Sequence, residues 1–499
     1  MLKRLRALMR LTATLLLLAA LLLAPAANSR AYTLQYTGAT AITQVRWPTT
    51  TINVALSTSL SNPPPYVRAT GEQVVAAARR ALASWSAVSN VQFNVTTRPE
   101  QDAAADGVSL ITVADTPANH ALFRGGLQPG RARVTFDSGG NIAEADLAVN
   151  PLVTRADPFA GEVRSFFSTD GTPDSYDLES TFVHEIGHML GLEHSGVAGA
   201  TMQPRQGANG TYNLANFSAR TLSADDIAGV RAVYGPHTGL GSIAGRVSYN
   251  GTAPTAAPAF GAHVVAEEVT TGRVAASNVA NAAGYYRIDG LAPGQYRVVV
   301  EQLDEPVVAA QLGVGAGGYP ASAIATQPAF LTAEAGNVTV APEATTTLNV
   351  SVAGAAAAVN PKFVGTGESF QLSTVAVPLE PGKTRSVLVG GNNLTLSPDG
   401  MVTGVSVNSP YVAVSNVQQV DGFGITVISF DVTAGALTPP GEYSLRLTTS
   451  SGQVAYVAGV LTVEPSSAKA EQTPPDAPAL TVARLRRDSE PPRPRRGLA

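Results

Sequence analysis

Three histidines lie within one short run of the chain, from His184 to His194, and a glutamate directly follows the first of them. The run reads His-Glu-x-x-His-x-x-Gly-x-x-His. Residues four positions apart in an α-helix stand on the same face, so the imidazoles of His184 and His188 can reach a single ion. Glu185 projects about 100° round the helix from His184, which leaves its carboxylate to address a metal-bound water.

Gly191 marks the expected end of this helix, because glycine takes the left-handed conformation of a helix C-terminus without steric cost. The chain then turns back and brings His194 to the ion as a third ligand. Three protein nitrogens leave one tetrahedral position open for water, which is typical of a catalytic zinc. Two histidines on an amphipathic helix can also be ordinary solvent-exposed polar residues. Three of the chain's six histidines fall in this run at the required spacing, which favours a metal site. His237 and His263 lie outside it and are expected to carry no chemistry.

The run resembles the zinc motif of the metzincin clan of endopeptidases, and Ser195 after the third histidine resembles the matrixin branch. Residues 200–204 resemble the Met-turn, in which a methionine, here Met202, forms an apolar floor beneath the imidazoles. Residues 222–235 are similar to the helix that closes matrixin catalytic domains. The resemblance covers about residues 44–236.

This resemblance implies a zinc metalloendopeptidase that hydrolyses internal peptide bonds of proteins through a zinc-bound water. It assigns roles to the residues of the two motifs: zinc ligands His184, His188 and His194, general base Glu185, and structural support Met202. The polypeptide substrate is expected to lie extended across the zinc.

Matrixins also carry a second, structural zinc that several histidines hold. The corresponding region here, about residues 114–150, contains only His120, so a single zinc is predicted and His120 is expected to be a solvated loop residue. Calcium is compatible with the resemblance, with Asp137 or Asp146 as ligands, although carboxylates of a turn and a strand edge explain them equally well. The chain has no cysteine, which excludes latency through a propeptide cysteine.

The first 31 residues have the form of a secretion signal: a basic start, an apolar stretch over residues 11–24, and small residues after it. An uncleaved anchor stays open as an alternative. An exported protein without cysteine must be held by its core, by bound ions, or by both. The net charge of −4 over 499 residues implies no nucleic-acid partner. The mature chain is expected to be extracellular or associated with the cell envelope, with no membrane span.

Hydrophobic periodicity predicts several strands and a long helix in the first part of the chain. Their order agrees with the α+β metzincin fold that the resemblance implies, a mixed twisted sheet plus long helices. The expected elements are a helix at 71–88 and strands at 51–56, 108–113, 133–137 and 142–149. The strand at 142–149 is predicted to be the exposed edge that pairs with substrate.

Past residue 236 the helical patterns disappear, and short alternating strands follow, separated by glycine and proline. The clearest strands are at 243–247, 261–266, 284–288 and 291–300. This part resembles the carboxypeptidase regulatory-like β-sandwich, and a later all-β stretch resembles an immunoglobulin-like module. Residues 305–360 hold either the remaining strands or a linker.

The expected organisation is therefore multidomain: signal peptide 1–31, matrixin-like catalytic domain 32–236, carboxypeptidase regulatory-like β-sandwich 241–355, immunoglobulin-like β-sandwich 356–465, and a disordered Pro/Arg-rich tail 466–499. The β-modules would attach the enzyme to a cell surface or polymer. The alternative is a non-catalytic adhesive protein with a passenger protease-like domain, but the intact histidines and glutamate favour the enzyme.

Overall fold

The structure is a computed structural model, and it describes residues 32–37, 43–123, 126–157, 161–210, 219–251, 256–312, 327–396 and 400–464. The predicted signal segment 1–31 and tail 466–499 lie outside the described residues. All described residues belong to one compact unit of the chain, Met1–Glu464. Within these ranges, none of the helices is long and apolar enough to cross a membrane.

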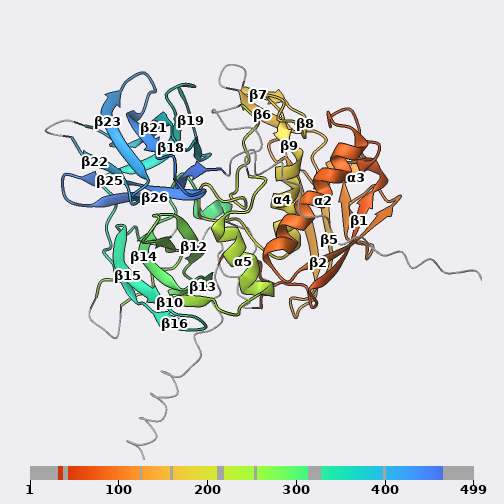
Figure 1. The fold of residues 1–499 in the computed structure, drawn as a ribbon, viewed down its shortest axis with the longest axis horizontal. Helices are drawn as coiled ribbons and strands as arrows, with labels where there is room; N and C mark the ends of the chain where they lie inside the picture. The colour runs from red at the N-terminus through yellow and green to blue at the C-terminus, as the bar shows by residue number, and fades with distance from the viewer. Residues whose placement is uncertain are drawn as a thin grey trace, which may run out of the picture. The chain divides into compact units, whose positions relative to one another are not determined.

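Residues 43–236, here called the first region, are built on a five-stranded mixed sheet (Figure 1). Its strands, from one edge to the other, are β2 (Gln92–Arg98), β1 (Thr51–Ser57), β3 (Leu110–Thr112), β5 (Ile142–Val149) and β4 (Gly130–Phe136). The first four pair in parallel, whereas β4 runs antiparallel to β5. The predicted strands and the mixed sheet are therefore confirmed.

The predicted edge strand is wrong. Residues 142–149 form β5, which lies between β3 and β4, and seven of its eight residues are buried. The outer strand is β4, the first arm of the hairpin that turns at residues 137–141. Sequence periodicity shows that two strands form a hairpin but not which arm pairs inward. Here the inner arm is the more apolar one, because it must contact neighbours on both sides.

Helix α2 (Gly71–Val88) begins at a capping box and confirms the predicted span. The Thr70 side chain accepts a hydrogen bond from the Gln73 N–H, and the Gln73 side chain accepts one from the Thr70 N–H. Its apolar face is buried and ends at Trp85, whose indole N–H donates to the carbonyl of Val183, 2.9 Å away. That bond ties α2 to the neighbouring helix α4.

Helix α4 (Leu178–Met189) contacts α2, β4 and β5 (Figure 1). Asp177 caps its first turn by accepting from the Ser180 N–H at 2.8 Å. The helix ends as predicted, since Gly191 has a φ of 84°, the left-handed value that glycine accommodates. The other elements of the first region are η1 (Thr58–Leu60), α3 (Pro117–His120), β6 (Thr154–Asp157), β7 (Gly161–Arg164), β8 (Phe167–Ser168), β9 (Tyr176–Asp177) and α5 (Ala224–Tyr234).

Residues 241–464, here called the β-rich region, contain four sheets within the described ranges. The first two sheets join β13 (Tyr285–Leu291), β10 (Gly241–Tyr249), β16 (Thr345–Thr347) and β17 (Val350–Val352), and β12 (Val274–Val279), β11 (His263–Glu268), β14 (Gly294–Glu301) and β15 (Ala333–Val340). One hydrophobic cluster takes side chains from both sheets, for example Ile288 of β13 and Val298 of β14. Residues 305–360, which the sequence left open, thus supply strands β15 to β17 and the short helix η3 (Ala309–Gln311).

The other two sheets share a second cluster, to which Val389 and Leu445 belong. They join β19 (Gln371–Ser373), β18 (Asn360–Thr366), β21 (Thr384–Asn392), β24 (Thr426–Ala434) and β23 (Val412–Val420), and β20 (Val377–Leu379), β26 (Val454–Val463), β25 (Gly441–Thr449) and β22 (Val402–Val407). The alternating strands predicted past residue 236 are present, and the chain is rich in β-structure there.

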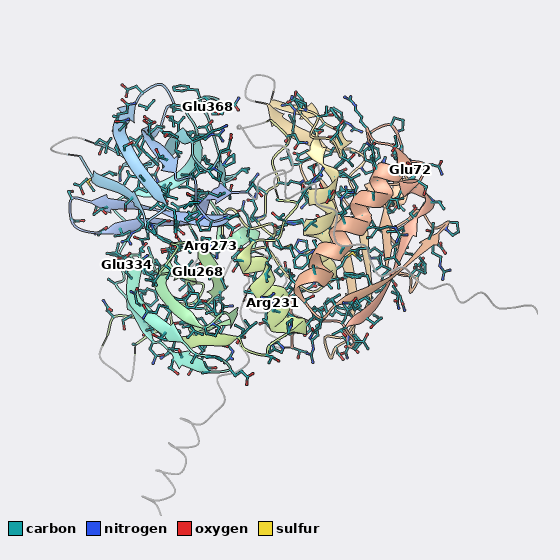
Figure 2. The ribbon with its side chains drawn as sticks, viewed as in Figure 1. Glu72, Arg231, Glu268, Arg273, Glu334 and Glu368 are labelled. Carbon is teal, nitrogen blue, oxygen red and sulfur yellow. The ribbon has the colours of Figure 1, made fainter. Side chains whose placement is uncertain are left out.

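Polar contacts join the two pairs of sheets. Arg273 forms an ion pair with Glu268 at 3.0 Å and donates to the carbonyl of Pro440 at 2.9 Å. Arg446 pairs with Glu334, which Figure 2 labels together with Arg273 and Glu268. A charged side chain that bonds across two sheets restrains both, because breaking the contact would leave partly buried polar groups unpaired.

Candidate metal centre

The structure brings the three histidines of the run together. His184 and His188 project from α4, and His194 follows the turn at Gly191. Their ring centroids are 4.8 to 5.3 Å apart, and one ligand atom from each lies within 4.8 Å of the others. Among the described residues, this is the one group of three or more histidine, cysteine or acidic side chains that converges in this way.

Backbone carbonyls fix the tautomer of all three rings. Each Nδ1 lies close to a carbonyl oxygen: His184 to Thr201 (2.8 Å), His188 to Leu192 (2.8 Å) and His194 to Gln311 (2.6 Å). A carbonyl can only accept, so each Nδ1 carries the proton and each Nε2 keeps its lone pair. Burial also lowers the pKa of each ring, to about 3 for His194, so all three are neutral near pH 7. Neutral imidazoles with convergent lone pairs are the form that binds a divalent metal.

Glu185 is 6% exposed and lies beneath the start of the edge strand β4. Burial raises the pKa of its carboxyl to about 8, while a hydrogen bond from the Ala132 N–H and the charge of Arg131 oppose that shift. Gly130 leaves the room this side chain needs, because a Cβ there would stand 2.8 Å from the Glu185 Cγ. Strand β4 therefore positions the carboxylate as well as forming the sheet edge.

Met202 is fully buried in the core of the first region. A Cβ on Gly187 would stand 2.3 Å from its sulfur and 2.9 Å from Trp85 Cζ2, so the methionine lies directly against α4 between the histidine positions. Asp226 of α5 holds the turn by accepting from the N–H groups of Thr201 and Met202, at 2.9 and 3.2 Å. The methionine therefore packs against the segment of α4 that lies between His184 and His188.

Two residues that contact the site were not among the site residues predicted from the sequence. Asp225 of α5 accepts from the Ser195 hydroxyl at 2.5 Å and from the N–H of Ser277 in β12 at 2.6 Å. Gln311, which holds His194, belongs to the β-rich region and lies 117 residues along the chain. Asp225 lies in the motif at residues 222–235, so its helix was recognisable from the sequence. No motif in the sequence around Gln311 indicates a role in the site.

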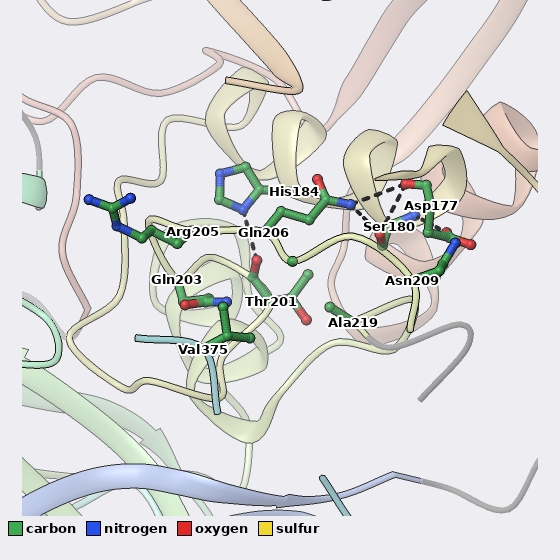
Figure 3. A pocket seen from close by; sticks show the side chains of 11 residues that line it. Asp177, Ser180, His184, Thr201, Gln203, Arg205, Gln206, Asn209, Ala219 and Val375 are labelled. Atoms are coloured by element: carbon green, nitrogen blue, oxygen red, sulfur yellow. Dashed lines mark hydrogen bonds between the residues drawn. The ribbon is translucent and has the colours of Figure 1, made fainter. Parts of the chain in front are cut away.

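A pocket of about 50 Å³ opens beside His184 (Figure 3). Gln206 forms one wall, and its amide donates to the Ser180 hydroxyl at 2.6 Å, which fixes its orientation. Arg205 also lines the pocket. Val375 closes another side, although it lies in the β-rich region between β19 and β20. Both regions therefore shape the space next to the histidines.

The other candidate ligands stay apart from this group. His120 ends α3, and its Nε2 lies 2.6 Å from Asp115 at the surface. Asp137 is exposed and accepts from the Asn141 N–H at 2.9 Å. Asp146 is 1% exposed and accepts from the Leu110 N–H at 3.0 Å, while its Oδ2 has no hydrogen-bond partner among the described residues. Burial raises the pKa of Asp146 to about 7.

The comparisons agree with this geometry. Residues 116–235 match the model of the matrixin family, and this segment contains the whole histidine run. The hatching enzyme of Paracentrotus lividus is 33% identical over 138 residues, 27% of this chain and 21% of that protein. Metalloendoproteinase 1 of Glycine max is 27% identical over 202 residues, 38% of this chain and 53% of that protein. Stromelysin-1 of Rattus norvegicus is 29% identical over 167 residues, covering 34% and 30%.

The chain thus spans between about a fifth and about a half of the length of these relatives. The match supports a matrixin-like metalloprotease region, and the family implies a catalytic zinc. A solved Bacteroides ovatus glucan-utilisation protein overlaps at 13% identity with a TM-score of 0.17, which is too low to bear on the fold of the β-rich region.

Proposed function

We propose that this protein is a secreted zinc-dependent endopeptidase that hydrolyses internal peptide bonds of proteins. The observation that carries the proposal is the orientation of the three imidazoles. Each is neutral, each is held at Nδ1 by a carbonyl, and the three free lone pairs converge on one point. The matrixin match over residues 116–235 supports the same function at the level of the family.

His184, His188 and His194 would hold the zinc, and this donor set suits it, because three nitrogens leave a fourth position for a reacting group. When bound, zinc would lower the pKa of a water and polarise the carbonyl of the scissile bond. Glu185 would be the general base in its ionised form, which the charge of a bound cation would favour over the protonated form that burial favours. It would take a proton from the attacking water and pass it to the departing amine. Met202 supports the rings by packing and takes no part in the chemistry.

The substrate would bind as an extended polypeptide along the edge strand β4. Among the described strands β4 pairs with β5 alone, and its N-terminal end lies over Glu185. Backbone pairing with such an edge selects polypeptides over small molecules. The pocket beside His184 would take one substrate side chain, which places Gln206 and Val375 in contact with it.

We include secretion in this proposal because residues 1–31 have the form of a secretion signal. Attachment to a cell surface or polymer through the β-rich region, and calcium binding at Asp137 or Asp146, are further expectations of this kind. The assignment of residues 32–236, 241–355 and 356–465 to separate modules also stays a prediction.

The test is cleavage of a quenched polypeptide by the purified full-length chain, before and after a chelator and after zinc is added back. We expect activity that the chelator removes and zinc restores. A metal-loaded, folded protein that cleaves none of a broad peptide library would contradict the proposal and favour a binding role.

A further inference from the structure

The loop that joins His194 to Met202 is covered by the β-rich region. The N–H of Ala198, in the middle of the loop, donates to the carbonyl of Ala458 in β26 at 3.0 Å. Ala198 also belongs to the same buried cluster as Leu303 and Leu312. The conformation of this loop therefore depends on contacts with the β-rich region.

Two glycines of the loop allow this close approach. A Cβ on Gly196 would stand 2.6 Å from Nε2 of His263, the first residue of β11. A Cβ on Gly199 would stand 2.4 Å from a methyl group of Thr462 in β26. Contacts this short have no room for a methyl group, so the loop lies directly on both pairs of sheets.

One contact reaches a histidine of the metal centre itself. The Gln311 carbonyl accepts from His194 Nδ1 at 2.6 Å. Gln311 is fixed in turn at both of its ends: its N–H donates to the Val308 carbonyl at 2.9 Å, and its side-chain oxygen accepts from the Val308 N–H at 3.1 Å. The side chain of Gln311 thus stabilises the turn in which its own backbone carbonyl points towards His194 Nδ1.

The other two histidines are held by acceptors within the first region, 17 and 4 residues away, whereas the acceptor of His194 is 117 residues away. A partner on the second nitrogen sets both the direction and the basicity of a metal-binding imidazole. Without the Val308–Gln311 turn, His194 would keep its place after Gly191 but lose the bond that orients its ring.

We propose that Gln311 is a positioning residue of the metal centre, acting through His194, so that the β-rich region is a working part of that centre. The inference rests on the proposed function, because it presumes that the three histidines bind a metal. It deepens that function by adding a residue from outside the matrixin-like segment, which ends at residue 235.

The first test measures metal binding by the full-length chain. Zn²⁺ affinity is determined by competition with a chromogenic chelator, and the visible spectrum is recorded with Co²⁺ in place of Zn²⁺. We expect Gln311→Ala to weaken Zn²⁺ binding about tenfold. This is the lower end of the range of about 10–100-fold for loss of such a partner, because the variant keeps the carbonyl and loses only the side chain that fixes it. The Co²⁺ bands should also shift, because the ligand geometry changes.

Two controls separate positioning from general damage. Gln311→Glu keeps a side-chain oxygen that can accept from Val308 and should bind metal as the wild type does. Gln295→Ala makes the same truncation at an exposed position of β14 and should change neither affinity nor spectrum. Circular dichroism and thermal unfolding show whether each variant is folded.

A second pair of variants tests the covered loop independently. Gly196→Ala should weaken metal binding, because its methyl group meets the His263 ring. Adding His263→Ala removes that ring and should restore most of the affinity. If folded Gln311→Ala retains wild-type affinity and spectrum, the positioning role of Gln311 is overturned. If the wild type itself binds no Zn²⁺, it is the proposed function that fails.

Discussion

The first region and the β-rich region contribute to the metal centre in opposite ways. In the first region the chemistry is concentrated in an eleven-residue run, and helical geometry alone brings two of its histidines together. The β-rich region has no such run, yet it supplies the carbonyl that holds His194 and a wall of the adjacent pocket. A local motif thus provides the three candidate ligands, and long-range packing provides part of their orientation.

The same contrast appears in the charges buried between the two regions. Asp225 and Asp226 of α5 are fully buried, and each accepts hydrogen bonds from several donors. Glu442 of β25 faces them across the loop at Gly199, and its Oε2 has no partner. Where the two regions meet, the aspartates of α5 therefore have hydrogen-bond donors within the described residues, whereas one carboxylate oxygen of Glu442 has none there.

The comparison predicts that changes in the run affect catalysis most. Glu185→Ala should keep the metal and lower the rate of peptide hydrolysis by about 10²–10⁴-fold, the usual contribution of a positioned general base. The measurement is kcat on a quenched peptide together with zinc content. Glu72→Ala, which removes an exposed acid of α2 outside the site, is the matched control. Wild-type turnover by Glu185→Ala would remove the assigned role.

The next largest effect is expected for the close packing between Gly187, Met202 and Trp85, and it should appear in the free energy of unfolding. Gly187→Ala places a methyl group 2.3 Å from the Met202 sulfur and 2.9 Å from Trp85, both in the core. We expect a loss of about 1–3 kcal/mol, as for other overpacked cores. Thermal unfolding measures it. Met202→Leu, which conserves volume, should cost less than about 1.5 kcal/mol and keep most of the activity.

The β-rich region should affect selectivity through the pocket. Val375→Trp would fill the space beside His184 and discriminate against substrates with a large side chain there. We expect kcat/KM for such peptides to fall by about tenfold relative to peptides with a small side chain. Digestion of a peptide library by both proteins gives the ratio. An unchanged preference would show that the pocket does not contact substrate.

The smallest expected effect is a pH-dependent one at Glu442. Burial, together with the charges of Asp226, Glu464 and Asp225, raises the pKa of its carboxyl to about 8 from an ordinary 4.5. The folded chain therefore holds this proton more tightly than the unfolded chain, and stability falls as pH rises from about 4.5 towards 8. Glu442→Gln removes that penalty.

Thermal unfolding at two pH values tests this sign. Glu442→Gln should be more stable than the wild type by about 1 kcal/mol or more at pH 8, since one pKa unit corresponds to about 1.4 kcal/mol. The difference should be close to zero near pH 5. A destabilised variant at pH 8 would mean that the ionised carboxylate is well accommodated.

Several features of the fold were predictable because local sequence determines them. The span of α2 follows from its capping residues and apolar face, and the end of α4 follows from Gly191. The position of β5 in the sheet was predicted wrongly, since pairing partners depend on tertiary contacts that periodicity does not encode.

In the candidate site, too, the features that depend on local sequence were predictable and those that depend on tertiary contacts were not. The run fixes where the histidines and Glu185 fall on α4 and after it, and the structure brings the three imidazoles together. The sequence could not reveal the Gln311 carbonyl or Val375, because a backbone acceptor leaves no mark on residue identity and a valine is ordinary in a β-rich segment. His263, expected to carry no chemistry, is buried against the loop and paired with Glu301 at 2.8 Å.

Metal analysis of the purified full-length chain beside His188→Ala tests the central claim most directly. The account predicts about one equivalent of zinc in the wild type, none retained by His188→Ala after dialysis, and peptide cleavage only by the former. Equal metal content in the two proteins, or no metal in a folded wild type that also fails to bind added Zn²⁺, would contradict it.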